Sequence, residues 1–242
     1  MAYTRRTAAT TLHTAATRSD RQHEWYRVAT GFVRHTAGRP SRDAAGRMSQ
    51  PTQESGASHA GAFQRAYADR NVCVTGGAGF IGSNLVEALV GCGARVHIID
   101  DLSSGRESNL DSIIESVKLT RASILDDDAL RAACADAETV FHLAAVTSVP
   151  RSVEEPTLFH EINAIGTARV LEAARLGTTT RLVYASSSSV YGEQAGDVKD
   201  ETMYPDPRSP YAASKLAGEV MLQAYAHCYD LSCISLRYFN IF

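Results

Sequence analysis

The sequence predicts an α/β fold in which a doubly wound parallel sheet occupies residues 67–242. From residue 71 onward, short apolar runs alternate with segments that have helical spacing. Glycines connect the first apolar run to the first helical segment. Such a tight strand-to-helix turn is typical of nucleotide-binding α/β folds, in which it contacts the ligand. Strands separated by helices form right-handed crossover units, and such units build a parallel sheet.

Six short runs are expected to be strands because they are apolar, mostly β-branched and bounded by turn residues. In order they are 71–75, 95–100, 117–121, 139–143, 181–185 and 231–238. The run 117–121 is the weakest of the six, because it contains two basic residues.

Four helices are expected between these strands. Residues 80–90 carry apolar residues at helical spacing, and 126–134 begins with acids that suit the positive end of a helix. Pro150 and Pro156 precede one long helix over 155–175, and Pro210 starts the helix 211–229. These helices would cover the two faces of the sheet.

Residues 1–66 differ in composition from the rest. Residues 1–50 contain nine arginines, no lysine and three acids, without sustained periodicity. The segment is predicted to be a disordered tail, because it has too little apolar surface to bury. A transit peptide, or a start placed too early with Met48 as the true first residue, would have the same composition.

Bulk properties exclude several function classes. The net charge of −3 gives no general attraction to nucleic acid or to an anionic membrane, and no run of 18 apolar residues exists. Five cysteines, an odd number without a CxxC pair, favour free thiols in a reducing compartment over disulfides or a metal site. A cytoplasmic enzyme without metal is therefore expected.

The glycine cluster is the candidate cofactor site. Gly76, Gly79 and Gly82 allow a tight turn, and the helix beginning near Phe80 would aim its free N–H groups at a pyrophosphate. Asp100 ends the next strand, where its carboxylate could accept both hydroxyls of an adenosine ribose. With Asp101 beside it, this charge would repel a 2′-phosphate, so NAD is favoured over NADP.

The candidate catalytic groups lie near the other end of the chain. Tyr211 and Lys215 are four residues apart and share a helix face. An ammonium and the positive nicotinamide ring of NAD⁺ would both favour the phenolate, which can then act as a base. A serine run at 186–189 follows an apolar strand and could hold the substrate oxygen. Together with the glycine cluster, these residues predict oxidation at a carbinol carbon.

Seven motifs resemble the extended short-chain dehydrogenase/reductase family, and within it the NAD-dependent nucleotide-sugar epimerases and dehydratases. The resemblance runs from residue 71 to residue 242. The motifs are TGGAGFIGSNL (75–85), DDLSSG (100–105), HLAA (142–145), SVPRS (148–152), SSSSVYG (186–192), SPYAASK (209–215) and LRYFN (236–240). It implies a Rossmann domain, NAD as cofactor and a UDP-sugar as substrate.

The resemblance assigns roles residue by residue. It implies Ser187, Tyr211 and Lys215 as the catalytic set, and Ser148, Ser187, Tyr211 and Asn240 as contacts of the sugar nucleotide. The implied NAD contacts are Gly76, Gly79, Phe80, Ile81, Gly82, Asp100, Asp101, Ser103, Gly105, Ser123, Ile124, Leu143, Ala144, Ala145, Asn163, Tyr211, Lys215 and Tyr238. One departure is visible at Ser123, where relatives usually carry an acid that holds the adenine amino group.

The subtype follows from the residue two positions after the catalytic hydroxyl. Related dehydratases and decarboxylases carry glutamate there, whereas this chain has Ser189. This favours 4-epimerisation of a UDP-hexose or, given the stretch 144–152, a UDP-N-acetylhexosamine. The alternatives are another sugar-nucleotide reaction of the family or an inactive NAD-binding fragment.

Relatives continue for roughly a hundred residues after RYFN, so the resemblance implies that the C-terminal substrate domain is missing here. Residues 1–242 are then expected to bind cofactor without useful turnover of UDP-sugars. Full-length relatives are implied to be homodimers.

Overall fold

The fold is described by a computed structural model for residues 54–194 and 198–241, with side chains from residue 61 onward. The helices and strands of the described residues lie in one compact unit, and residues 200–204 belong to a second unit. Of the tail predicted for residues 1–66, residues 1–53 lie outside the described residues. None of the helices in the described part of the chain has the length and apolarity that crossing a membrane requires.

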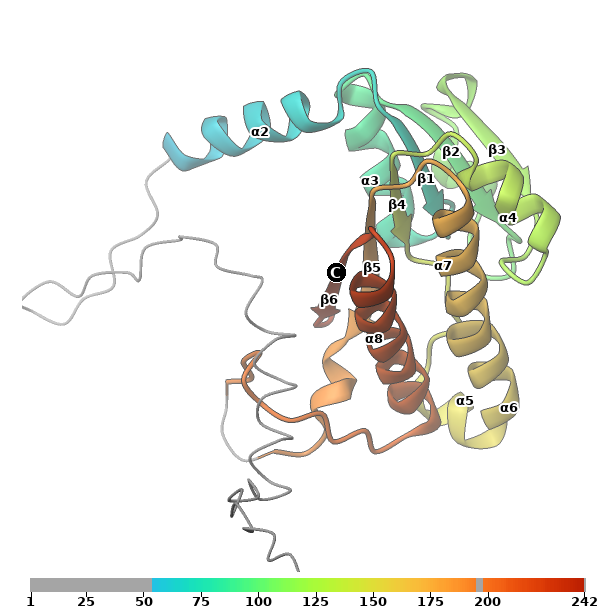
Figure 1. Cartoon of the computed structure of the whole chain (residues 1–242), viewed down its shortest axis with the longest axis vertical. Coiled ribbons are helices and arrows are strands. Elements are labelled where there is room, and N and C mark those ends of the chain that lie inside the picture. Colours follow the sequence, from blue (N-terminus) through green and yellow to red (C-terminus); the bar gives the residue numbers. More distant parts are fainter. Residues whose placement is uncertain (1–53, 195–197, 242) are drawn as a thin grey trace, which may run out of the picture. The chain divides into compact units, whose positions relative to one another are not determined.

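Six parallel strands form one sheet in the order β3-β2-β1-β4-β5-β6, the strand order of a Rossmann fold (Figure 1). This confirms the predicted fold class. The strands are β1 (Asn71–Thr75), β2 (Arg95–Asp100), β3 (Val117–Arg121), β4 (Thr139–His142), β5 (Arg181–Ser187) and β6 (Ser232–Tyr238).

Helices α4 (Asp127–Cys134), α7 (Gly166–Leu176) and α8 (Pro210–Cys228) cover one face of the sheet, and Figure 1 shows α7 and α8 side by side. Their buried residues form one apolar cluster with alternate residues of the strands. Local sequence starts two of these helices. Asp126 accepts hydrogen bonds from two backbone N–H groups of α4, and Ser209 accepts one from Ala212 of α8.

The opposite face is covered by α3 (Phe80–Gly91) and α2 (Glu54–Tyr67), with two 3₁₀ turns, η1 (Glu107–Leu110) and η2 (Ile114–Ser116). Helix α2 corrects the predicted boundary at residue 67. Its Phe63 and Tyr67 rings lie 4.8 Å apart, and Tyr67 lies 5.8 Å from the ring of Phe141. These aromatic contacts, rather than periodicity along the helix, attach it to the sheet.

The predicted helix 155–175 is also corrected. The structure has α5 (Val149–Glu154), α6 (Pro156–Phe159), a π-helical turn η3 (His160–Ile165) and then α7. Prolines at the first positions of α5 and α6 break the segment into short helices. The π turn carries Asn163 into the interior, and such turns are frequent at functional sites.

The carboxyl ends of parallel strands meet at one edge of the sheet, which we call the carboxyl edge. Thr75, Asp100, His142, Ser187 and Tyr238 end their strands there. In the register of the sheet, Ser187 lies opposite Tyr238. In an open sheet of this kind, ligands bind beyond this edge.

Candidate functional site

The glycine turn after β1 packs against the segment that follows β4. Gly76 has a φ of +71°, and a Cβ at this position would lie 2.6 Å from the backbone nitrogen of Ala144. A Cβ on Gly82 would overlap the carbonyl oxygen of Gly76. Only glycine fits at both positions, so the helix start and the strand ends lie close enough for a pyrophosphate to contact backbone.

The N-terminus of α3 provides donors for that pyrophosphate. Its capping residue is Gly79, which has no side chain that could bond to the N–H groups of the first turn. The N–H groups of the first turn, from Phe80 to Gly82, are therefore available to an anion. These free N–H groups fit the predicted binding of a dinucleotide pyrophosphate.

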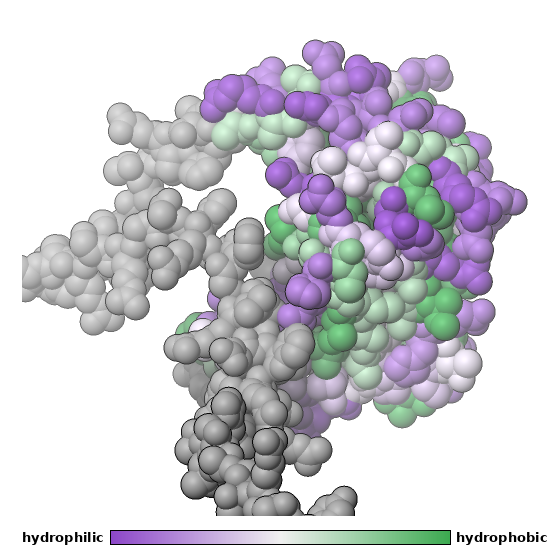
Figure 2. All heavy atoms as spheres, in the orientation of Figure 1, coloured by the Kyte–Doolittle hydropathy of each residue, from purple (hydrophilic) through white to green (hydrophobic). Residues whose placement is uncertain are grey.

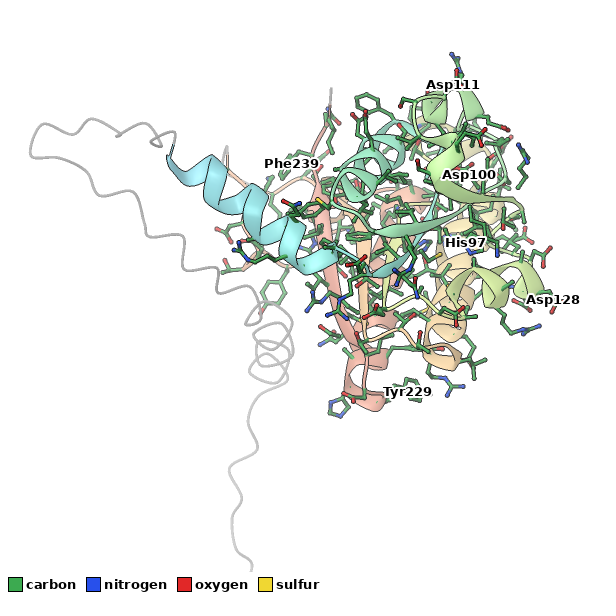
Figure 3. All side chains as sticks on the ribbon, turned by 90° about the horizontal axis from the view of Figure 1, so that it is seen from above. His97, Asp100, Asp111, Asp128, Tyr229 and Phe239 are labelled. Atoms are coloured by element: carbon green, nitrogen blue, oxygen red, sulfur yellow. The ribbon has the colours of Figure 1, made fainter. Side chains whose placement is uncertain are left out.

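Asp100, labelled in Figure 3, is 7% exposed and joins the glycine turn to the loop after β2. One carboxylate oxygen accepts a hydrogen bond from the Ala78 N–H at 2.9 Å, and the other accepts one from the Leu102 N–H at 2.9 Å. Each oxygen keeps a free lone pair, so the carboxylate can still accept ribose hydroxyls. The second acid, Asp101, is exposed and holds the N–H and hydroxyl of Ser103.

Three further residues were predicted to contact the adenosine half of NAD, namely Gly105, Ser123 and Ile124. A Cβ on Gly105 would lie 2.9 Å from the backbone of Ala78, so this loop also passes close to the glycine turn. The Ser123 hydroxyl accepts a hydrogen bond from the Leu125 N–H, and Ile124 is buried in the core. The contacts of these residues with NAD stay predictions.

Asn163 holds the segment after β4 in place. Its amide oxygen accepts a hydrogen bond from the Val146 N–H at 2.9 Å, and its amide nitrogen donates to the Val146 carbonyl at 3.0 Å and to the Ser214 hydroxyl at 3.1 Å. This side chain thus fixes the path of residues 143–146, which include the predicted NAD contacts Leu143, Ala144 and Ala145.

His142 is a buried residue to which sequence reasoning gave no role, although it belongs to the HLAA motif. Its two ring nitrogens lie 2.7 Å from the Thr75 hydroxyl and 2.9 Å from the Thr167 hydroxyl. Burial, with a smaller effect from the charge of Lys215, lowers the pKa of His142 to about 3. The ring is therefore neutral and joins β1, β4 and α7 beneath the site.

The three predicted catalytic residues come together from β5 and α8. The Ser187 hydroxyl is near enough to the Tyr211 phenol to affect its pKa, and the Tyr211 ring packs edge-on against Phe159 with centroids 6.2 Å apart. The hydroxyls of Ser187 and Ser189 share a hydrogen bond at 2.8 Å. A phenol with a hydroxyl beside it can bind a substrate alcohol and exchange a proton with it.

The pKa of Tyr211 differs from the expectation. Burial raises it above its ordinary value, and the hydrogen bond with Ser187 opposes this rise. Lys215, expected to lower it, lies with its Nζ 2.9 Å from the Ala185 carbonyl oxygen and 5.0 Å from the centroid of the Tyr184 ring. Burial lowers the pKa of Lys215 to about 7, so its charge is weakened in this environment.

The predicted sugar contacts have contrasting environments. Ser148 has a φ of +95°, which is strained for a residue with a side chain, and its hydroxyl accepts a hydrogen bond from the Arg151 N–H. Asn240 is exposed. Its neighbour Tyr238, a predicted NAD contact, is half-buried, which raises the pKa of its phenol. Their roles stay predictions.

A partly buried ion pair next to the serine run was also missed. Arg237 on β6 makes two hydrogen bonds with Glu219 on α8, at 2.9 and 2.8 Å, and the Ser186 hydroxyl donates to the same carboxylate. The guanidinium carbon of Arg237 lies 4.5 Å from the centre of the Tyr191 ring. The helical spacing of Glu219 from Lys215 was a signal that could have found it.

Comparisons with known proteins agree with this geometry. The sequence pattern of the NAD dependent epimerase/dehydratase family matches residues 72–242. A UDP-glucose 4-epimerase of Mycolicibacterium smegmatis is 46% identical over 174 residues, which cover 70% of this chain and 55% of the relative.

Two solved structures share the fold. One is a UDP-N-acetylglucosamine 4-epimerase from Methanobrevibacter ruminantium in complex with UDP-N-acetylmuramic acid, with 40% identity and a TM-score of 0.69 over 72% of this chain and 56% of that one. The other is a UDP-glucose 4-epimerase from Brucella ovis in complex with NAD, with 35% identity and a TM-score of 0.65 over 71% and 52%. The chain thus spans about half the length of the relatives it matches.

Proposed function

Because this chain belongs to the NAD-dependent epimerase/dehydratase family, we propose that it binds NAD at the carboxyl edge and epimerises a UDP-sugar at C4. The substrate class would be a UDP-hexose or a UDP-N-acetylhexosamine, the substrates named for its relatives. The observation that carries the proposal is that Ser187 ends its strand at the same carboxyl edge as the glycine turn, near Tyr211 of α8, with Lys215 on the same helix.

The cofactor would lie along the segment that Asn163 and Thr75 hold. The glycine turn and the first turn of α3 would contact the pyrophosphate, and Asp100 would accept the hydroxyls of the adenosine ribose. When bound, NAD supplies a hydride acceptor and a positive ring that favours a neighbouring phenolate. The carboxylate of Asp100 disfavours the extra phosphate of NADP.

Side chains of the protein would accept and return the proton of the C4 hydroxyl. Tyr211, as phenolate, accepts the proton of the C4 hydroxyl, and Ser187 donates a hydrogen bond to the same oxygen. Oxidation gives a 4-keto sugar, and its return to the alcohol on the other face needs the same proton back from Tyr211. Lys215 fastens α8 to β5, which keeps the phenol beside the serine.

The side chains around Ser187 favour epimerisation over dehydration. Elimination of water needs a second acid–base group near the sugar, but the run 186–189 offers only hydroxyls. The carboxylate of Glu219 lies close to this run, yet it is bound by Arg237 and by Ser186. Because these two partners occupy the carboxylate, it does not replace the missing group.

The proposal includes two further expectations, on cellular location and on oligomeric state. We place the protein in the cytoplasm, supported by its five free cysteines, and expect it to form a homodimer. Figure 2 shows apolar residues interrupting the hydrophilic surface on the face that it displays. Ile165 of η3 and Val220 of α8 are 54% and 57% exposed, and a second copy would cover such side chains.

The proposal is tested by two measurements on the same preparation. Calorimetric titration with NAD and NADP should give a clear preference for NAD. Because residues 1–242 are not expected to turn UDP-sugars over at a useful rate, the second measurement keeps the chain in excess of the sugar. Incubation with NAD and each of UDP-glucose and UDP-N-acetylglucosamine should then yield the C4 epimer slowly, as detected by nuclear magnetic resonance. A product lighter by one water would indicate dehydration instead, and NAD binding without any conversion would restrict this chain to cofactor binding.

A further inference from the structure

We propose that Tyr184 is a positioning residue whose ring face holds the ammonium group of Lys215 in place and favours its charged form. Tyr184 belongs to β5, the strand that ends at Ser187, and its side chain is fully buried. The inference rests on the proposed function, in which a charged Lys215 favours the phenolate of Tyr211. It assigns a role to a buried phenol that lies outside the expected Ser-Tyr-Lys set.

The ammonium group of Lys215 lies between a carbonyl group and an aromatic ring. Its Nζ donates a hydrogen bond to the Ala185 carbonyl oxygen at 2.9 Å and lies over the ring of Tyr184, 5.0 Å from the centroid. A cation within about 6 Å of a ring centroid is attracted by the negative charge on the face of the ring. The attraction is larger at a desolvated site, and Lys215 is only 3% exposed.

The ring has this task because no acid performs it. Within the described part of the chain, none of the ion pairs includes Lys215. A buried ammonium group without a carboxylate loses its hydration and gains no opposite charge in return, which favours the neutral amine. The carbonyl of Ala185 and the face of Tyr184 therefore replace part of the stabilisation that water would give.

Tyr184 is held in position from two other elements. The ring of His142 on β4 lies 5.4 Å from its ring, between centroids. On the other side, a Cβ at Gly218 of α8 would lie 2.4 Å from the Tyr184 phenol oxygen, so only glycine lets the helix approach the ring this closely. A ring confined between a strand and a helix presents a fixed face to Lys215.

The ionisable groups around the pair do not change charge while Lys215 titrates. Burial lowers the pKa of His142 to about 3, so this ring is neutral. Burial also raises the pKa of Tyr184, with smaller contributions in the same direction from Glu219 and Tyr211 on α8. Tyr184 therefore acts as a neutral phenol, whose ring face attracts a cation without carrying a net charge.

The test measures the pKa of Lys215 by nuclear magnetic resonance in the whole chain. The sequence contains three lysines, Lys118, Lys199 and Lys215, so carbon-13 labelling of lysine gives few resonances, and Lys215→Met assigns one of them. Tyr184→Phe keeps the ring face and should leave the pKa of Lys215 nearly unchanged. Trifluorophenylalanine at position 184 keeps the shape of phenylalanine but withdraws charge from the ring face. It should lower the pKa by roughly half a unit to one and a half units relative to Tyr184→Phe.

A matched control separates the ring face from the effect of fluorine in the core. Phe141 is also buried, but it belongs to the apolar cluster on the opposite face of the sheet. Trifluorophenylalanine at position 141 should leave the titration of Lys215 unchanged. If three fluorines at position 184 prevent folding, as judged by thermal unfolding, monofluorinated phenylalanine at the same position should give a smaller shift in the same direction.

Equal pKa values of Lys215 with phenylalanine and with fluorinated phenylalanine at position 184 would overturn the proposal. So would a fall in Tyr184→Phe as large as that expected from fluorination, since the hydroxyl rather than the ring would then be responsible. An equal shift from position 141 would also contradict it. The titration needs neither NAD nor a sugar, so each of these results is distinguishable from failure of the proposed epimerisation.

Discussion

The Nζ of Lys215 lies 2.9 Å from the carbonyl oxygen of Ala185, two residues before Ser187 on the same strand. The bond ties the first half of α8, which carries the proposed catalytic Tyr211, to the strand that carries Ser187. It also places the amine in a buried environment that lowers its pKa to about 7. Lys215 therefore has a structural function in addition to the catalytic role expected for it.

The first prediction concerns Lys215 and pH. An unfolded lysine has a pKa near 10.4, so between about pH 7 and 10 the unfolded chain binds more protons at this position than the folded chain. The free energy of unfolding should then rise as the pH is raised from 7 to 8.5. In Lys215→Met this part of the slope should disappear, as measured by urea unfolding at several pH values. An equal slope in both proteins would contradict the buried amine.

The second prediction concerns His142 in acid. Its folded pKa is about 3 and its ordinary value about 6.5, so the unfolded chain binds the extra proton between these values. The free energy of unfolding should fall by up to about 1.4 kcal/mol per unit as the pH decreases through this window. Denaturation of His142→Gln should show a shallower dependence. His97→Gln is the matched control, since the half-buried His97, with a pKa near 4, should contribute with the same sign over a narrower window.

The third prediction concerns the glycine turn. Gly76→Ala should abolish NAD binding, because the residue has a positive φ and its Cβ would overlap the backbone of Ala144. Gly91→Ala, in α3 with open space around its Cβ, is the control and should bind NAD normally. Calorimetric titration measures both. Normal affinity in Gly76→Ala would show that the turn does not contact the cofactor.

The fourth prediction separates a partly buried ion pair from an exposed one. Arg237→Met should destabilise the fold by about 1–3 kcal/mol, because it leaves the partly buried carboxylate of Glu219 with the Ser186 hydroxyl but without its charged partner. Arg175→Met removes the exposed partner of Glu172 and should change the unfolding free energy little. Chemical denaturation compares the two. Similar effects would mean that water reaches the Glu219–Arg237 pair.

The fifth prediction concerns cofactor choice. Asp100→Asn should weaken NAD binding and reduce the preference over NADP, because it removes the charge beside the ribose while keeping an acceptor for the Ala78 N–H. Asp101→Asn alters an exposed side chain that holds Ser103, so its effect should be smaller. Parallel titrations with both cofactors measure the ratio. Equal discrimination in Asp100→Asn would exclude its role in selecting NAD.

Much of the fold could be predicted because its signals are local. Each strand is a short apolar run, and glycines and prolines mark where it turns. Helix α2 was missed because its attachment depends on Phe63 and Tyr67 meeting Phe141, a residue far away in the sequence. The division of 155–175 depends on how Asn163 turns inward toward Val146 and Ser214, which periodicity along one helix does not reveal.

In the candidate site, too, local features could be predicted and contacts between distant residues could not. Tyr211 and Lys215 could be paired from their spacing, and Ser187 from its motif. The contacts that set their properties cross between elements, such as Lys215 with Ala185 or Glu219 with Arg237. A pKa depends on burial and on such neighbours, so the raised value of Tyr211 could not be read from the sequence.

The most direct test of the account is the conversion of a UDP-sugar by Tyr211→Phe, compared with the unaltered chain under single-turnover conditions with NAD. The account predicts a rate lower by about 10²–10⁴-fold, the usual contribution of a general acid–base group, with the affinity for NAD unchanged. A rate in Tyr211→Phe equal to that of the unaltered chain would contradict the assignment of the phenol as the group that takes the C4 proton.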